Sequence, residues 1–294
     1  MESISIAAAG GRALDVLVAG AQTGPALVLH HGTPSDATLW DGWDDIARAR
    51  GLRLVAISRP GYATSTRRSG RRIADVVDDV ETALQHFESP WFVTAGWSGG
   101  GPHALACAAR LPSCRAAATL GGVGAYGVAD LDFLNGMGPE NHAEFGAALQ
   151  GERVLREWLA ENAEAMRSVT GSELAAAFGG LVPQADKDVL NGGLAERMAA
   201  TMRRALANGF DGWIDDDLAF IQPWGFELST IAVPVAVWQG DLDLMVPFAH
   251  GEWLRRHLPH ATPHPAPGHG HISLMVAYRD AIVDELLANA QRAR

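Results

Sequence analysis

The fold of this chain is decided by the stretch Val93-Thr94-Ala95-Gly96-Trp97-Ser98-Gly99-Gly100-Gly101-Pro102-His103. The apolar run at residues 91–95 predicts a buried strand, and the alanine-rich run at residues 102–110 predicts a helix that ends before Pro112. Between them, residues 96–100 fit the pattern G-x-S-x-G. A serine on so tight a turn has a strained backbone and presents its hydroxyl at the carboxyl edge of a sheet. Ser98 is therefore the first candidate functional residue.

The glycines of this turn have a steric purpose. Gly96 and Gly100 carry no side chain where strand and helix approach each other, so the two backbones can touch. Pro102 falls in the first helical turn, where no backbone donor is needed. The same pattern also occurs in glycine-rich loops that merely connect two elements, so its meaning depends on partners elsewhere in the chain.

The composition narrows the class of protein. The chain has 294 residues, of which 48% are hydrophobic and 19% charged, and its formal net charge is −11. This length suits one large domain, or one domain with a sizeable insertion. The acidic balance makes a general nucleic-acid binder a poor candidate. The notable basic cluster is Arg67-Arg68 with Arg71-Arg72, which we interpret as a solvated loop and helix start.

The first residues and the cysteines indicate a cytoplasmic protein. Residues 1–6 contain neither a basic region nor a long apolar core, so no signal peptide is expected. No apolar run approaches the roughly 18 residues that a membrane span needs. Cys107 and Cys114 do not make a disulfide framework, and we predict both to be small buried side chains.

Strands and helices alternate over the first part of the chain. Strands are expected at residues 3–6, 14–18, 26–30, 52–57, 91–95 and 115–120. Helices are expected from residue 35 or 36 to 50, at 73–87 and at 102–110. Strands that are apolar throughout, separated by helices, are typical of a parallel sheet covered on both faces.

The alternation stops after Gly124. From about residue 125 to 226 the sequence has helical periodicity and no convincing strand. The α/β pattern then resumes with a strand at 233–238, a helix at 248–257, a short strand near 261–264 and a helix from about 272 to 292. We predict an α/β core formed by residues 1–124 and 227–294, interrupted by a helical insertion at residues 125–226.

A serine hydroxyl is a poor nucleophile at neutral pH. It needs a base within hydrogen-bond reach, and the base needs an acid that fixes its tautomer and stabilises its charged form. Asp241 and Asp243 follow the strand expected at residues 233–238. His269 and His271 lie further on, just before the last expected helix. The chain thus provides an acid and then a base after later strands, with two candidates for each.

With these residues in place, the chain resembles the α/β-hydrolase family over essentially its whole length. The similarity includes His31-Gly32-Thr33-Pro34, the turn at residues 96–100, and a form of D-R-P-G-x-G-x-S at residues 58–65. Ser58 stands where the family often has Asp, and Ala63 where it often has Gly; we expect little catalytic effect from either. The resemblance implies a mostly parallel, eight-stranded α/β-hydrolase sheet with helices on both faces and a helical cap.

The resemblance also selects among the candidate acids and bases. The family's acid commonly sits in a G-x-x-D-x-x-V-P setting, which Asp243 matches and Asp241 does not. The alternative is that either Asp only caps the following helix. A G-H pair followed by an apolar and a small residue favours His271 over His269. The implied catalytic triad is therefore Ser98, His271 and Asp243.

The oxyanion hole of such an enzyme needs two backbone N–H donors. The resemblance implies Gly99, directly after the nucleophile, and Thr33, in the loop that resembles the family's H-G-x-P. His31 is expected to hold that loop in shape rather than to act as a second base. Trp97 either narrows the acyl side of the site or packs under the turn.

We therefore expect a carboxylesterase-like serine hydrolase that cleaves a small ester-like or other acyl substrate through an acyl-enzyme. No cofactor or metal is implied, because no cluster with metal-ligand spacing appears. Apolar residues of the expected cap suggest an apolar substrate, or else form the cap's own core. They are Phe133, Leu134, Met137, Phe145, Trp213 and Phe220.

Other functions on the same scaffold stay open, since fold and triad do not choose among them. They are a proline-iminopeptidase-like peptidase, a carbon–carbon hydrolase, a lactonase and a perhydrolase. A dehalogenase or an epoxide hydrolase would need a carboxylate in place of Ser98. From a different class, a ligand-binding protein could keep the pocket without turnover.

Overall fold

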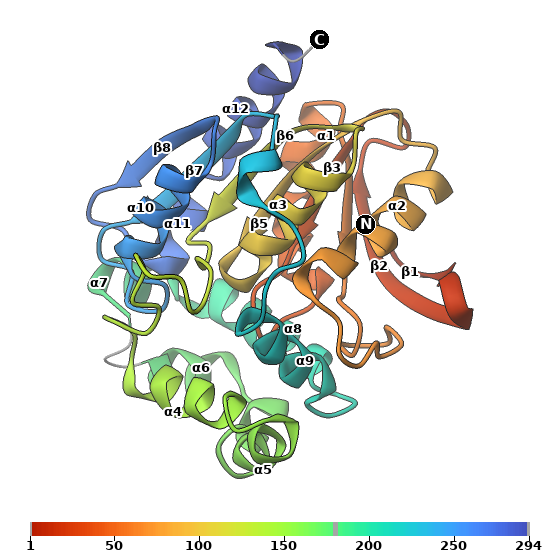
Figure 1. Ribbon diagram of the computed structural model, residues 1–294. Coiled ribbons are helices and arrows are strands. Elements are labelled where there is room, and N and C mark those ends of the chain that lie inside the picture. Colours follow the sequence, from red (N-terminus) through yellow and green to blue (C-terminus); the bar gives the residue numbers. More distant parts are fainter. Residues whose placement is uncertain (1, 179–181, 293–294) are drawn as a thin grey trace.

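The structure is a computed structural model that describes residues 2–178 and 182–292. Its centre is an eight-stranded sheet with the order β1-β2-β4-β3-β5-β6-β7-β8 (Figure 1). The strands are β1 (Glu2–Ala8), β2 (Arg12–Gly20), β3 (Ala26–His30), β4 (Arg53–Ile57), β5 (Phe92–Trp97), β6 (Cys114–Leu120), β7 (Val235–Gly240) and β8 (Ala261–Ala266). Pairing is antiparallel between β1 and β2 and between β2 and β4, and parallel between all other neighbours. The predicted mostly parallel sheet is confirmed.

Helices cover both faces of this sheet. They are α1 (Asp44–Ala49), α2 (Val76–His86), α3 (Gly101–Arg110), α4 (Pro139–Ala148), α5 (Glu152–Asn162), α6 (Gly171–Phe178), α7 (Gln184–Val189), α8 (Gly192–Ala205), α9 (Asp211–Phe220), α10 (Phe248–His257), α11 (His271–Ala277) and α12 (Arg279–Arg292). Successive residues of β3 show the two faces. Leu27 belongs to the apolar cluster that includes Leu286 of α12, and Val28 to the cluster that includes Leu105 of α3. This is the period of two expected of a strand buried on both sides.

Three predicted helices differ from those observed, and the one expected at residues 73–87 begins as a 3-10 helix, Ile73–Asp75, before α2. The helix expected from residue 35 or 36 to 50 begins as a 3-10 helix, Ala37–Trp43, before α1, and its cap is Asp36, whose carboxylate accepts from Thr38 N at 2.8 Å. The helix expected at residues 272–292 is α11 and α12, separated by Tyr278 at φ −108°, ψ 10°. The Tyr278 ring packs 5.1 Å from that of Trp238, a long-range contact that periodicity does not reveal.

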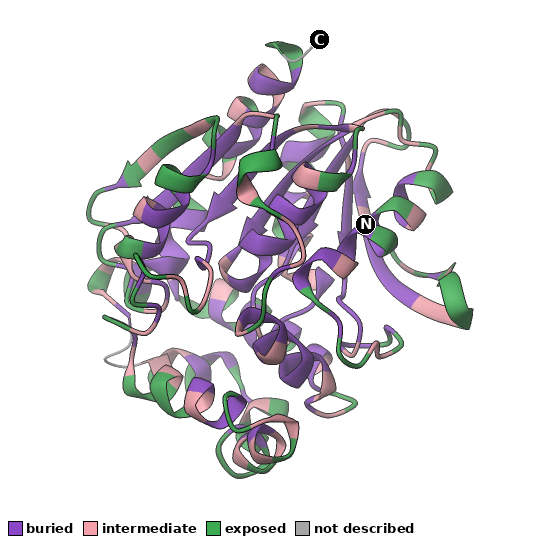
Figure 2. Cartoon of the chain, in the orientation of Figure 1, coloured by how far each residue is buried: buried purple, intermediate pink, exposed green. Residues whose placement is uncertain are grey.

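Residues 125–226, called the helical segment below, contain α4 to α9 and no strand among the residues described. In Figure 1, α4, α5 and α6 lie at the end away from the sheet, and α8 and α9 lie nearer to it. Figure 2 shows the inner strands of the sheet buried, the edge strands β1 and β8 largely exposed or half-buried, and much of α4 and α5 exposed. Helix α9 differs from these, because all but two of its ten residues are buried.

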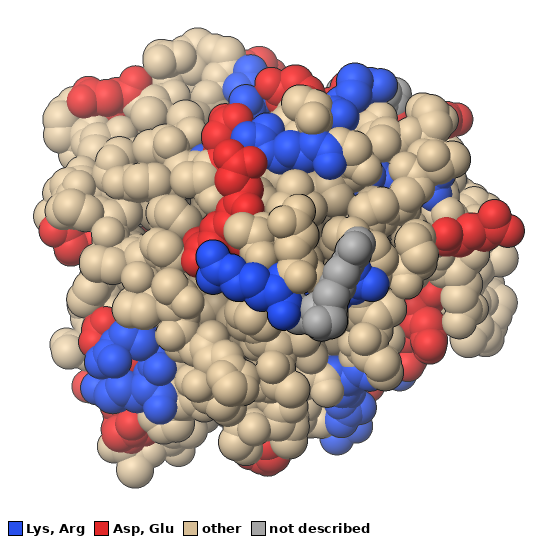
Figure 3. Space-filling model, turned by 90° about the horizontal axis from the view of Figure 1, so that it is seen from above, with Lys and Arg blue, Asp and Glu red and all other residues tan. Residues whose placement is uncertain are grey.

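The predicted state of the cysteines is confirmed, since Cys107 and Cys114 are free and buried. No helix within the described ranges has the length and apolar character needed to cross a membrane. On the face seen from above in Figure 3, acidic and basic side chains lie side by side.

Candidate active site

The turn after β5 is a tight strand-to-helix elbow with a strained backbone. Strand β5 ends at Trp97, a single 3-10 turn covers Ser98–Gly100, and α3 follows at once. Ser98 has φ +57°, a conformation that side-chain-bearing residues adopt rarely and that marks functional strain. A Cβ placed on Gly96 would lie 2.1 Å from Gly100 O, so the close approach of strand and helix requires glycine there, as predicted.

A buried histidine and a buried aspartate form a pair beside this elbow. His271 Nδ1 bonds to Asp243 Oδ2 at 2.7 Å, and their side chains are 2% and 0% exposed. Asp243 Oδ1 accepts from the backbone N–H groups of Met245, at 3.0 Å, and Val246, at 2.8 Å. The carboxylate can only accept, so the proton of the neutral ring lies on Nδ1. Nε2 then carries the lone pair that can take up a proton.

The alternative acid and base lie outside this pair. Asp241 is exposed and accepts from Gly268 N at 2.7 Å. The His269 ring lies edge-on to Tyr278, with centroids 5.3 Å apart. The structure therefore brings His271 to Asp243, and not His269 or Asp241.

The His271–Asp243 pair and Ser98 lie at the same edge of the sheet. The rings of Trp97 and His271 are 4.9 Å apart, and Trp97 Nε1 donates to His271 O at 3.0 Å. A Cβ on Gly121, which follows β6, would lie 2.9 Å from His271 Nδ1 and 3.0 Å from Asp243 Oδ2. Among the residues described, no hydrogen bond joins Ser98 Oγ to His271. Such bonds are often long in unliganded enzymes and shorten when substrate binds.

The two residues predicted to supply the oxyanion donors are also neighbours. A Cβ on Gly99 would lie 2.7 Å from Thr33 Oγ1. In the loop before Thr33, His31 Nε2 accepts from Arg59 N at 3.0 Å, and His31 Nδ1 donates to Gly32 O at 2.8 Å. Burial holds the pKa of His31 well below its ordinary value, so the ring is neutral. Both of its nitrogens are occupied by backbone groups, which is the loop-holding role expected of it.

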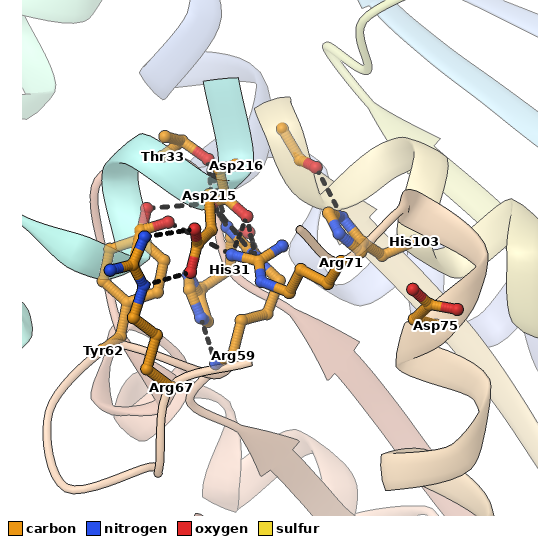
Figure 4. A network of polar contacts seen from close by, with 12 residues as sticks. His31, Thr33, Arg59, Tyr62, Arg67, Arg71, Asp75, His103, Asp215 and Asp216 are labelled. Atoms are coloured by element: carbon orange, nitrogen blue, oxygen red, sulfur yellow. Dashed lines mark hydrogen bonds and ion pairs between the residues drawn. The ribbon is translucent and has the colours of Figure 1, made fainter. Parts of the chain in front are cut away.

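A second polar cluster meets this loop and was missed by the sequence analysis (Figure 4). Asp216 of α9 accepts from Arg59 Nη2 at 2.6 Å, Arg71 Nη2 at 2.6 Å, Tyr62 Oη at 2.9 Å and Thr33 Oγ1 at 2.6 Å. The interpretation of the arginine cluster as solvated is wrong for Arg71, which is only 6% exposed. Its partner lies 145 residues further along the chain, so local sequence could not reveal the pair.

The apolar residues singled out in the helical segment have more than one role. All are buried except Leu134, which packs against the core while partly exposed. The rings of Phe133 and Phe145 pack edge to face, 5.1 Å apart, within the protein core. Phe220 lies at the site itself, because a Cβ on Gly99 would come within 2.7 Å of its ring.

A further histidine connects the loop after β6 to the helical segment. His250 Nδ1 accepts from Gly124 N at 2.9 Å, and its Nε2 donates to Phe133 O at 2.9 Å. Burial lowers the pKa of His250 to about 4, so the ring is neutral near pH 7. Within residues 2–178 and 182–292, no group of three or more His, Cys, Asp and Glu side chains is arranged to hold a metal ion.

Comparison with known proteins places this geometry in context. A family model described as the alpha/beta hydrolase fold matches residues 25–278. Among solved structures, a hydrolase from Pseudomonas aeruginosa PA01 is 20% identical, with TM-score 0.69 and coverage of 98% of this chain and 97% of that one. An esterase from Rhodococcus sp. ECU1013 is 17% identical, with TM-score 0.71 and full coverage of both chains, 100% each. The enol-lactonase from Burkholderia xenovorans LB400 is 19% identical, with TM-score 0.66 and coverage of 97% and 100%. No match was found among curated proteins.

Proposed function

The chain belongs to the alpha/beta hydrolase fold family, and we propose that it is a serine hydrolase that cleaves a small ester-like or other acyl substrate. In this proposal Ser98 is the nucleophile, His271 the base and Asp243 the acid. The N–H groups of Gly99 and Thr33 are the oxyanion donors. One observation carries the proposal: a serine at φ +57° on a strand-to-helix turn directly follows Trp97, whose ring lies 4.9 Å from that of His271 in a buried imidazole–carboxylate pair.

The reaction follows from the positions of these groups. Ser98 Oγ attacks the carbonyl carbon of the substrate while its proton passes to His271 Nε2, and the carbonyl electron pair moves onto oxygen. The oxyanion accepts hydrogen bonds from the Gly99 and Thr33 amides. When this intermediate collapses, the leaving group takes the proton from His271 and an acyl-enzyme is left. Water then repeats the sequence, with Ser98 as the leaving group.

Asp243 has two tasks in this scheme. It holds the proton of the neutral His271 ring on Nδ1, and it stabilises the imidazolium that forms during attack. The bonds from Met245 N and Val246 N to its other oxygen support both tasks, because they fix the carboxylate before the reaction begins.

We also propose that the helical segment, residues 125–226, is a cap over a core made of residues 1–124 and 227–294. Two contacts support this. Phe220 of α9 borders Gly99, and Asp186 of α7 accepts from Ser273 N, in the helix that begins with His271, at 2.8 Å. The rings of Phe220 and Trp97 next to the elbow favour an apolar acyl group.

Labelling with a fluorophosphonate tests the proposal, since this probe forms a covalent bond with an activated serine. The wild type is expected to be labelled, and Ser98→Ala and His271→Ala are expected to lose labelling. Ser69→Ala and His269→Ala are the matched controls and are expected to retain it. Labelling that persists in Ser98→Ala would contradict the assignment. A folded wild type that is never labelled would instead indicate a binding protein without turnover.

Turnover of p-nitrophenyl esters from acetate to octanoate then defines the substrate class. Ser98→Ala is expected to lower kcat by about 10³-fold or more, because loss of a triad member removes the covalent route. Hydrolysis of these esters that is unchanged in Ser98→Ala would exclude the acyl-enzyme mechanism.

A further inference from the structure

The peptide unit that joins Gly32 to Thr33 is fixed at its carbonyl end. Gly32 O accepts from His31 Nδ1 at 2.8 Å and from Arg59 Nη2 at 2.9 Å, so both of its lone pairs are engaged. An amide is planar, and its C=O and N–H therefore turn together. Holding Gly32 O in this way sets the direction of the Thr33 N–H, the proposed oxyanion donor.

Asp216 anchors the groups that hold this peptide. Its carboxylate accepts from Arg59 Nε at 3.0 Å and from Arg59 Nη2 at 2.6 Å, and it is 0% exposed. The same carboxylate accepts from Thr33 Oγ1 at 2.6 Å. Figure 4 shows Asp216 between these groups. One side chain thus restrains Thr33 directly and, through Arg59, restrains the carbonyl behind the Thr33 amide.

The charge state of this cluster does not change near neutral pH. Burial opposes ionisation of Asp216, but the guanidiniums of Arg59 and Arg71 outweigh burial and hold the pKa of Asp216 well below its ordinary value. A carboxylate can only accept, so the Thr33 hydroxyl must donate to it. That hydroxyl is consequently not free to bind the oxyanion, and only the Thr33 N–H serves as a donor.

Helix α9 reaches the other donor as well. Phe220 follows Asp216 by four residues and so lies on the same helix face, one turn further along. A Cβ on Gly99 would meet the Phe220 ring at 2.7 Å, which shows how closely this ring borders the second donor residue. One face of α9 therefore contacts Thr33 and borders Gly99.

We propose that Asp216 is a positioning residue for the oxyanion hole, acting through Thr33 and Arg59, and that α9 forms one wall of that hole. This rests on the proposed function, because it assigns a role in the same reaction. In this proposal the oxyanion hole is formed by two parts of the chain, the loop after β3 and helix α9 of the helical segment. Displacement of α9 would disturb the hole while leaving the His271–Asp243 pair intact.

The test compares Asp216→Asn with Asp215→Asn. Asp215 is the neighbouring residue, is also buried and is held by Arg67 at 2.8 and 2.9 Å, but it has no bond to Thr33. Asp216→Asn is expected to lower kcat for an ester substrate by about 10- to 100-fold, since removing an oxyanion donor costs about 10²- to 10³-fold and this donor is only displaced. KM should change by less than about threefold. Asp215→Asn should retain the wild-type kcat.

Variants of Thr33 keep the test informative if Asp216→Asn does not fold. Thr33→Val retains the backbone N–H but not the hydroxyl, and its kcat is expected to fall by about 10-fold. Thr33→Ser, which restores the hydroxyl, should have a kcat several-fold higher than that of Thr33→Val. In a folded double variant, Asp216→Asn with Thr33→Val should be little slower than Asp216→Asn alone, because both remove the same restraint.

Two results would overturn the inference: a kcat for Asp216→Asn no lower than for Asp215→Asn, or a Thr33→Val variant with the wild-type kcat. Failure of the proposed function looks different, because the wild type would then show no turnover that depends on Ser98. Thermal unfolding of each variant separates loss of positioning from loss of the fold.

Discussion

Two buried carboxylates lie near the ends of the parallel strands, and they have different kinds of partner. Asp243 holds the imidazole of His271, whereas Asp216 holds the guanidiniums of Arg59 and Arg71. An imidazole changes charge near neutral pH and a guanidinium does not. The first carboxylate can therefore support proton transfer, and the second can only hold other groups in position.

The surroundings of the two carboxylates agree with this division. Asp243 accepts two of its hydrogen bonds from backbone N–H groups, so its negative charge remains stabilised when His271 is neutral. The charge of Asp216 is stabilised mainly by side chains that carry full positive charges, including Arg59 Nη2 at 2.6 Å. Removing Asp243 should consequently reduce activity more than removing Asp216 does, and removing Asp216 should reduce stability more than removing Asp243 does.

The largest effect on activity is expected from Asp243→Asn. The amide would present an N–H to His271, favouring the wrong tautomer, and a change of this kind lowers kcat by about 10⁴-fold in related chemistry. Asp241→Asn is the matched control two residues away, since Asp241 is exposed and its carboxylate accepts from the loop amide of Gly268. Steady-state hydrolysis of an ester gives the kcat of both variants. Equal losses in the two variants would contradict the assignment of Asp243.

The largest effect on stability is expected from Asp216→Ala. The substitution leaves the buried guanidiniums of Arg59 and Arg71 without their common counter-charge, which typically costs about 3–5 kcal/mol. Asp243→Ala leaves the backbone N–H groups of Met245 and Val246, and the neutral ring of His271, without their hydrogen-bond acceptor. A loss of this kind typically costs about 1–3 kcal/mol of stability. Urea unfolding at pH 7 gives both free energies. A greater loss of unfolding free energy in Asp243→Ala than in Asp216→Ala would contradict this expectation.

The half of the site built on Asp243 could be predicted from sequence because its members lie in recognisable local patterns. Ser98 sits in G-x-S-x-G, and the acid and base follow strands whose apolar runs are plain. Each strand expected from these runs is present in the sheet. The resemblance to a known family then chose between neighbouring candidates, such as His271 over His269, which periodicity alone could not do.

The half built on Asp216 could not be predicted, because its contacts join distant parts of the chain. Arg59 and Asp216 are 157 residues apart, one in a loop after β4 and the other in the helical segment. One signal was present: residues 215–217 are three successive acids within the segment expected to be helical. At 100° per residue they span about 200° of the helix, which is more than half of its circumference but still leaves an arc wide enough for an apolar face. The sequence does not say which residue faces inward, or that Arg71 is buried with it.

A third buried group, His250, differs from both carboxylates because it lacks a strong counter-charge. Burial lowers its pKa from 6.5 to about 4. Below pH 6.5 the unfolded chain binds a proton there and the folded protein does not. The stabilisation is therefore complete above pH 6.5 and is lost as the pH falls through 4, by about 3 kcal/mol at about 1.4 kcal/mol per pKa unit. Asp243→Asn and Asp216→Ala should still show this loss of stability when the pH is lowered.

Urea unfolding at about pH 7 and pH 4.5 checks this expectation. His250→Gln is expected to lose less stability between the two values than the wild type, since glutamine cannot take up the proton. His86→Gln, at an exposed position, should behave as the wild type. An identical loss in His250→Gln would assign the acid sensitivity to the other buried histidines, such as His30, whose pKa burial lowers to about 3.

The smallest effect is expected from Gly121→Ala, and it separates damage to the His271–Asp243 pair from general strain. Gly121 and Gly127 both have positive φ, +54° and +75°, so alanine at either costs about 1–2 kcal/mol of stability. A Cβ on Gly121 would press on His271 Nδ1 at 2.9 Å, whereas one on Gly127 meets nothing within 4 Å. Ester hydrolysis should therefore fall by about 10-fold in Gly121→Ala and stay unchanged in Gly127→Ala, although both unfold at lower urea concentrations than the wild type. Equal activity in the two variants would mean that the pair tolerates displacement, and that its close fit against Gly121 has no part in catalysis.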